Sequence, residues 1–130
     1  MIYLDTSIAL AQLLAEDRMP PAQLWEETLI TSRLLVYELW TRLHGRGLVR
    51  SHGDLAQNLL DRLALVELAP DILARALEPF PSPVRTLDAL HLATLDFLSK
   101  KNQEVQLASY DEHMVTCARL LAIPVYDPFQ

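Results

Sequence analysis

Four acidic residues stand in mostly apolar sequence, and together their side chains could do metal chemistry. They are Asp5, Glu38, Asp88 and Asp111. If the four side chains converge, each close pair of carboxylates repels by about 4 kcal/mol at roughly 4 Å and an effective dielectric constant of about 20. Such a cluster must raise its pKa values or bind a cation. Because the donors are all carboxylate oxygens, the cation they favour is Mg²⁺ or Mn²⁺.

One or two such ions in an acidic cleft are suited to the hydrolysis of a phosphodiester bond. They lower the pKa of a water molecule, orient the scissile phosphate and stabilise charge on the leaving oxygen. Each acid also has a simpler explanation when it is taken alone. Asp88 would favour the start of its helix, Asp111 would cap the next helix, and Glu38 would face solvent between core residues. The prediction of a metal site therefore depends on the acids meeting in one place.

The acids can meet only if the secondary structure carries them to one edge of the fold. Short apolar stretches rich in β-favouring residues predict strands at residues 2–4, 29–31, 66–68 and 105–108, and an edge strand at 124–126. Helical patterns fall between them, at about residues 6–16, 24–27, 33–44, 51–62, 70–77, 87–100 and 112–121. This alternation indicates a parallel sheet with helices on both faces. Asp5 ends the first strand and Asp111 follows the fourth, at the carboxyl edge where such sheets bind ligands.

Hydroxyl side chains indicate where several of these helices begin. The expected N-caps are Thr6 or Ser7 for the first helix, Ser32 for the helix from residue 33, and Thr86 for the helix from residue 87. Residues 51–54 resemble a capping box with aspartate in place of the usual glutamate. Since another residue can cap the first helix, Asp5 is the hardest of the four acids to explain structurally.

Composition and charge set the class of protein. Residues 1–130 fit one domain, because half of them are hydrophobic and no linker divides them. The single cysteine suits a reducing cytoplasm, and no apolar run approaches the roughly 20 residues that span a bilayer, so we expect a soluble cytoplasmic protein. The net charge of -6 argues against nucleic acid as a partner. A loaded metal site would weaken that objection, and a local basic rim could come from Arg33, Arg42, Arg46 and Arg50.

The acids lie in an ordered set of motifs that resembles the PIN domain family, and more narrowly its VapC-type toxins. The motifs are LDTS, an isolated glutamate in RLLVYELW, then RTLDALHLA, then LASYDEHM, and they cover essentially the whole chain. The resemblance implies a three-layer α/β/α PIN-like (flavodoxin-like) fold with a parallel sheet of four to five strands. It also implies a metal-dependent endoribonuclease. Asp5, Glu38, Asp88 and Asp111 match the acidic cluster that would bind Mg²⁺ or Mn²⁺ and carry catalysis.

The resemblance also extends to neighbouring residues and to partners. Ser7 matches a polar position after the DT pair, and Ser109 stands where such proteins often carry a small hydroxyl residue, so both are expected to bind substrate. Arg85, three residues before Asp88, could hold a substrate phosphate or neutralise the acids. His91, one turn after Asp88, could touch metal or RNA but is more simply a satisfied interior histidine, and Asp96 and Cys117 are structural or incidental. The implied partners are RNA, a cognate antitoxin that blocks the cleft, and a second copy in a homodimer.

Three other functions would use a similar arrangement of acids. A phosphoryl-receiver-like module would need a lysine after a late strand, whereas Lys100 and Lys101 both precede the fourth strand. An aspartyl-nucleophile phosphatase would need a second aspartate two residues after Asp5, where Ser7 stands. A degenerate PIN fold that only binds its partner would have lost some of the acids, whereas this sequence keeps all four.

Overall fold

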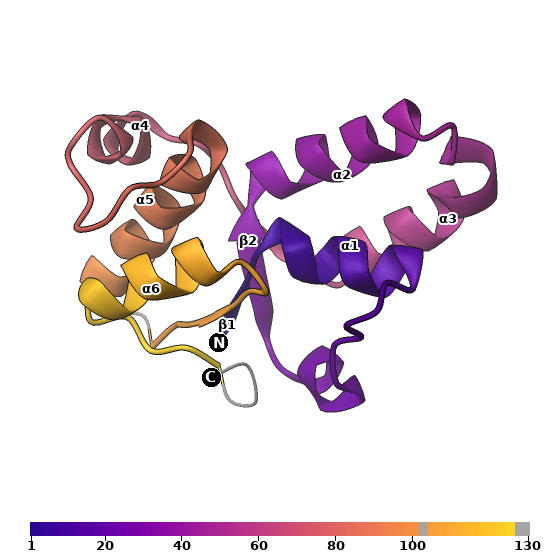
Figure 1. Cartoon of the computed structure of the whole chain (residues 1–130), viewed down its shortest axis with the longest axis horizontal. Helices are drawn as coiled ribbons and strands as arrows, with labels where there is room; N and C mark the ends of the chain where they lie inside the picture. The colour runs from indigo at the N-terminus through magenta and orange to yellow at the C-terminus, as the bar shows by residue number, and fades with distance from the viewer. Residues whose placement is uncertain (102–103, 127–130) are drawn as a thin grey trace.

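The computed structural model describes residues 1–101 and 104–126, which form a parallel sheet between two layers of helices (Figure 1). The strands are β1 (Ile2–Leu4), β2 (Leu29–Ser32), β3 (Ala64–Val66) and β4 (Gln106–Ala108), in the spatial order β3-β2-β1-β4. The helices are α1 (Thr6–Leu14), α2 (Arg33–Gly45), α3 (Val49–Leu60), α4 (Pro70–Ala76), α5 (Thr86–Lys100) and α6 (Glu112–Leu120), with a 3₁₀ helix η1 (Ala22–Glu26). The expected α/β/α fold class is confirmed.

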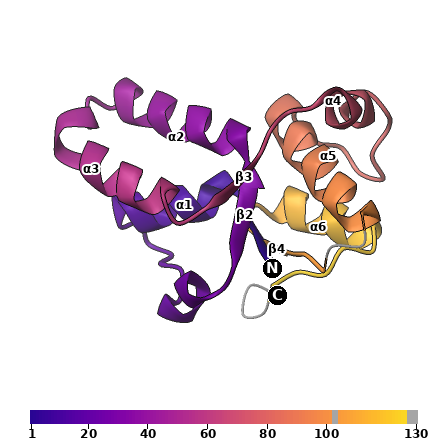
Figure 2. The same ribbon diagram turned by 180° about the vertical axis from the view of Figure 1, so that it is seen from behind.

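Each face of the sheet has its own apolar core. Both views place α1, α2 and α3 on one side of the sheet and α4, α5 and α6 on the other (Figures 1 and 2). Side chains alternate along a strand, so Ile2 and Leu4 pack into the first core while Tyr3 packs into the second. Fully buried leucines complete each core, for example Leu39 with the first and Leu92 with the second.

The strand order reverses beside β1, and this reversal positions the acids. The chain leaves β1 for α1 in one layer and leaves β4 for α6 in the other, so the two connections diverge at the carboxyl edge. Leu4 pairs with Ala108, and the backbone N–H of Asp5 donates to the Ala108 carbonyl at 3.0 Å. The residues that follow β1 and β4 are therefore neighbours at a topological switch point, where open α/β sheets bind ligands.

The first strand has its expected extent, the second and fourth each differ by one residue, and the other two differ more. The third strand begins two residues earlier than predicted, because its register pairs Ile30 with Ala64 and Ser32 with Val66. The predicted edge strand at residues 124–126 is only a single parallel bridge between Leu107 and Val125. Proline has no N–H to add to a ladder, which limits pairing at this edge.

The structure confirms one of the predicted helix caps and contradicts the others. Ser32 caps α2 as expected, since its Oγ accepts from the N–H of Leu34 at 3.1 Å. Thr6 and Thr86 are instead the first helical residues, after Asp5 and Arg85. The capping box at 51–54 is wrong, because α3 already begins at Val49 after the turn out of α2. That turn uses a positive φ of 65° at Gly47, which glycine adopts without strain.

Asp96 is structural, as predicted. Its Oδ2 accepts from Arg75 Nε at 2.7 Å and pairs with Lys100 Nζ at 3.0 Å, and this joins α4 to α5. Burial alone would raise the pKa of Asp96, but the bonds from Arg75 and Lys100 hold it below its usual value. The Arg75 guanidinium also lies 4.3 Å from the centre of the Phe80 ring. Cys117 is a buried core residue of α6.

Within the part of the chain that the structure describes, no helix is both long enough and apolar enough to span a bilayer.

Candidate active site

Asp5 lies at the switch point and is held there by two serines. It directly follows β1, and only 4% of the residue is exposed. Its Oδ2 accepts hydrogen bonds from Ser7 Oγ at 2.6 Å and from Ser109 Oγ at 2.8 Å. Each hydroxyl has one hydrogen to donate, so both are used on this carboxylate. The two serines thus orient Asp5, and their expected role toward substrate stays a prediction.

Asp111 caps α6 and also adjoins Asp5. Its Oδ1 accepts from the backbone N–H groups of His113 at 2.9 Å and Met114 at 3.3 Å, which confirms the simpler structural explanation for this residue. Its own N–H donates to Ser109 Oγ at 2.9 Å. Ser109 therefore bridges Asp5 and Asp111, and a capping role does not remove Asp111 from the site.

Glu38 reaches the same edge from α2 and is held by residues from the other elements. Its Oε1 accepts from Thr6 Oγ1 at 2.8 Å and lies 2.6 Å from His91 Nε2. His91 comes from α5, is 1% exposed, and its Nδ1 lies 2.7 Å from the hydroxyl of Tyr3. The prediction of His91 as a satisfied interior histidine is confirmed. The pair also joins the two helical layers past the end of the sheet.

The hydrogen bonds of His91 indicate which ring nitrogen carries the proton. Burial and the negative charge of Asp5 raise the pKa of Tyr3 far above its usual value, so its hydroxyl stays protonated. If that hydroxyl donates to Nδ1, the hydrogen of a neutral His91 is on Nε2 and points at Glu38. Tyr3 and His91 then present a fixed donor to this carboxylate.

Asp88 completes the set from the first turn of α5, where it is partly buried. Burial raises its pKa most, the negative charges of Asp111 and Asp5 raise it further, His91 opposes them, and Glu38 adds the smallest increase. The other three predicted acids therefore lie close enough to Asp88 to act on its charge, although the four come from separate parts of the chain. In residues 1–101 and 104–126, however, no three carboxylate, histidine or cysteine groups lie close enough together, as placed, to hold a metal ion.

The donor set nevertheless fits a hard divalent cation. All four side chains offer carboxylate oxygens, the ligands that Mg²⁺ and Mn²⁺ prefer. Burial is the largest cause of the raised pKa of Asp88, and the negative charges of the other three acids add to it. A divalent cation would offset this negative charge, and Asp5, Glu38, Asp88 and Asp111 are the residues that would hold the cation.

Two pockets adjoin the acids. One, of about 360 Å³, is lined by Asp88 and Asp111 together with Pro83, Val84, Arg85 and His113. Arg85, an exposed residue at the N-terminus of α5, lines this pocket with Asp88 and Asp111, and its expected contact with a substrate phosphate stays a prediction. The other pocket, of about 380 Å³, has Ser7 and Tyr110 among its lining residues.

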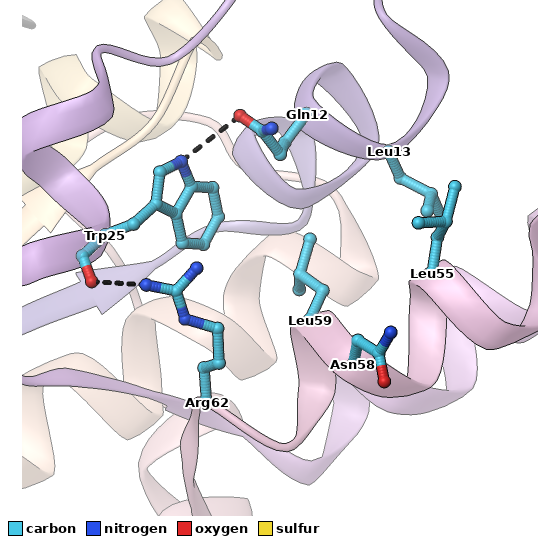
Figure 3. Close-up of a pocket in the computed structure, with 7 residues that line it drawn as sticks. All are labelled: Gln12, Leu13, Trp25, Leu55, Asn58, Leu59 and Arg62. Atoms are coloured by element: carbon cyan, nitrogen blue, oxygen red, sulfur yellow. Dashed lines mark hydrogen bonds between the residues drawn. The ribbon is translucent and has the colours of Figure 1, made fainter.

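A further pocket lies away from the acids and is not part of this site. Figure 3 shows its walls, which come from the C-terminal part of α1, from η1 and from α3. Trp25 closes one side, bonded through Nε1 to Gln12 and through its carbonyl to Arg62. It holds no carboxylate, so it offers no catalytic chemistry of the kind predicted here.

Several residues of the site were not assigned to it from the sequence. Thr6 was expected only as a cap, yet its hydroxyl bonds Glu38. Tyr3 was assigned only to the buried strand, and nothing in the sequence pairs it with a histidine 88 positions away. No role is predicted for His113, although it follows the SYD motif closely and lines the pocket with Asp88 and Asp111. The one sequence signal for these residues is that they are polar and lie close to the acids along the chain.

We expect Asp88→Asn to stabilise the metal-free protein at neutral pH. The raised pKa means that the unfolded chain loses this proton first as the pH rises, so the folded state is destabilised above the usual aspartate pKa. The amide removes that cost, whereas at acid pH both states are protonated and the gain disappears. Thermal unfolding in EDTA at neutral and acid pH measures this difference. A lower melting temperature than wild type at neutral pH would contradict the repulsion inferred here.

Comparison with known proteins identifies a family and solved structures with a similar fold. The model of the PIN domain family matches residues 2–120. Among solved structures, the chain is similar to the VapC20 toxin of Mycobacterium tuberculosis, described as cleaving the sarcin-ricin loop. The two are 21% identical, the alignment covers 89% of this chain and 94% of that chain, and the TM-score is 0.66. No curated protein matches the chain significantly.

Proposed function

Because the chain belongs to the PIN domain family, we propose that it is a metal-dependent endoribonuclease and the toxin of a toxin–antitoxin pair. The observation that carries the proposal is the proximity of Asp111, Asp5 and Glu38 to Asp88 where the strand order reverses: burial raises the pKa of Asp88 most, and these negative charges raise it further. The similarity in fold to a toxin described as cleaving the sarcin-ricin loop supports the choice of RNA as substrate.

The four acids would hold Mg²⁺ or Mn²⁺, and the protein orients them in advance. When bound, the cation supplies Lewis acidity, lowering the pKa of water and offsetting charge on the phosphodiester. Ser7 and Ser109 fix Asp5, while Thr6 and His91 fix Glu38. Carboxylates held in this way lose little freedom when the site is loaded.

The substrate we propose is single-stranded or loop RNA, whose backbone can bend into the crevice. The oxygen of a water molecule forms a bond to phosphorus, the bond from phosphorus to the 3′ oxygen breaks, and the 3′ oxygen takes a proton. The products are a 5′-phosphate and a 3′-hydroxyl. The 2′-hydroxyl takes no part, which separates this reaction from metal-independent RNA cleavage.

Cleavage of a mixed pool of unstructured RNA by purified protein tests the proposal. We expect cleavage with Mg²⁺ or Mn²⁺, none in EDTA, and product ends that carry a 5′-phosphate. Removal of the metal leaves the four acids with nothing to offset the phosphate charge, so activity should fall to background. Products with 2′,3′-cyclic phosphates, or undiminished cleavage in EDTA, would reject this mechanism.

Partners follow from the same proposal. A cognate antitoxin would block the acidic crevice, for example by presenting an arginine to the carboxylates, and a homodimer would place two crevices side by side. We expect the protein to act in the cytoplasm, where such a toxin meets RNA. Pull-down of a co-expressed antitoxin and measurement of the oligomeric state are the direct tests.

The receiver-like alternative is less well supported than the nuclease. Lys100 pairs with Asp96 at the end of α5, whereas Asp88 lies in the first turn of that helix. Lys100 is therefore not placed to pair with a phosphoryl group on Asp5. A PIN domain that only binds RNA remains the other candidate, and binding without cleavage under any metal would favour it.

A further inference from the structure

A pocket beside the acids carries cations and an aromatic ring that no part of the proposed chemistry uses. Its lining residues are Ser7, Leu10 and Ala11 of α1, Glu16, Asp17 and Arg18 of the following loop, Arg42 of α2, and Tyr110. We call this pocket of about 380 Å³ the arginine pocket. Elements from both ends of the sequence build it, so it exists only in the folded protein.

The arginine pocket adjoins the acids through Ser7. Ser7 Oγ donates to Asp5 Oδ2 at 2.6 Å and accepts from the Tyr110 backbone N–H at 3.0 Å, so one side chain belongs to both. Tyr110 immediately precedes Asp111, and Arg42 lies one helical turn after Glu38, on the same side of α2. A ligand in the pocket would continue toward the reacting phosphate.

The chemistry of the pocket suits a nucleotide. The guanidinium carbon of Arg18 lies 5.5 Å from the centre of the Tyr110 ring, so the two side chains are stacked. Bases of single-stranded RNA stack on such aromatic rings and guanidinium planes. Over residues 1–101 and 104–126, neither Arg18 nor Arg42 forms an ion pair, although Glu16 and Asp17 line the same pocket.

The two acids of the pocket restrict what can bind there. Two arginines and two carboxylates leave little net positive charge, so a bare phosphate ion gains little from the pocket. A ligand that brings both a phosphate and a base would gain from the arginine fork and from stacking. The pocket therefore favours an RNA strand over a free anion.

We propose that the arginine pocket binds one nucleotide of single-stranded RNA next to the scissile phosphate. Arg42 contacts its phosphate, and the Arg18–Tyr110 pair stacks on its base. This assignment rests on the proposed nuclease function and adds a subsite to it. It makes the crevice and the pocket one continuous track for the strand.

Binding of a fluorescein-labelled RNA octamer to the Asp5→Asn protein in Mg²⁺ tests the subsite without cleavage. Arg42→Ala in this background should weaken binding about fivefold or more and make the log–log salt slope less steep by about 0.7, the value for one phosphate contact on a single strand. Tyr110→Leu should weaken binding about tenfold, whereas Tyr110→Phe should restore it because stacking is kept. Inorganic phosphate should not compete.

The control is Arg119→Ala, an exposed arginine in the last turn of α6 that lines neither pocket beside the acids. Equal loss of binding in Arg42→Ala and Arg119→Ala, with equal salt slopes, overturns the subsite. If inorganic phosphate competes with the RNA octamer for the pocket, the subsite is also overturned in favour of a simple anion site. Normal cleavage by the parent protein with unchanged binding in Arg42→Ala rejects the subsite alone. If the parent protein never cleaves RNA but Arg42→Ala still weakens RNA binding, the nuclease function alone is rejected.

Discussion

Replacement of Asp5 by asparagine should reduce RNA cleavage about 100-fold or more while the protein stays folded. Asparagine has nearly the same shape, and its carbonyl oxygen can still accept the hydrogen bonds of Ser7 and Ser109. What it loses is the negative charge that would hold a divalent cation, which stabilises the transition state by several kcal/mol. The rate of cleavage of a defined RNA, measured at saturating Mn²⁺, gives the effect.

Asp54→Asn is the control for Asp5→Asn, because Asp54 is exposed on α3 and belongs to neither pocket beside the acids. It makes the same change of one charge and should cleave RNA like wild type. If both variants cleave equally well, Asp5 has no catalytic role and the acidic crevice is not the active site. Circular dichroism and a melting curve show whether each variant is folded.

Replacement of His91 by glutamine should raise the Mn²⁺ concentration needed for half-maximal cleavage by about 10- to 100-fold. His91 acts as a positioning residue, since it touches Glu38 and Tyr3 and not the substrate. Outer partners of this kind typically change metal affinity or activity by that factor when removed. Direct titration of Mn²⁺ binding should show the same shift in the absence of RNA.

The control for His91→Gln is a variant that weakens the fold without touching the acids. Leu98→Ala removes a buried side chain two turns further along α5 and should cost about 2–5 kcal/mol of unfolding free energy. Its requirement for Mn²⁺ should nevertheless match wild type at a temperature where it is folded. If His91→Gln needs no more metal than Leu98→Ala, the histidine is only a packing residue.

The arrangement of the acids could be predicted because it follows from local patterns. The apolar run that ends at Asp5 and the one that ends before Ser109 are recognisable strands, and alternating strands and helices imply a parallel sheet. The carboxyl ends of parallel strands share one edge, which brings Asp5 and Asp111 together. Asp88 follows a proline-rich loop, so the start of its helix was also visible.

The contacts that orient the acids could not be predicted in the same way. The bond between Tyr3 and His91 depends on the side to which a strand residue points and on how α5 rotates against the sheet. The predicted start of α3 at residue 51 is wrong. The turn at Gly47 leads straight into this helix, which begins at Val49 and so overrides the cap preference of Ser51. The stacking of Arg18 on Tyr110 joins a loop to a distant turn and leaves no pattern in either segment.

The bond between Glu38 and His91 ties together two halves of the molecule whose apolar interiors are otherwise divided by the sheet. Glu38 belongs to a helix packed against one interior, and His91 belongs to a helix packed against the other. Any loosening of either interior is therefore transmitted to the carboxylate over a gap of 2.6 Å. We therefore expect catalysis to fail at a lower temperature than the one at which the protein unfolds, so loss of activity should report loosening of the fold before unfolding does.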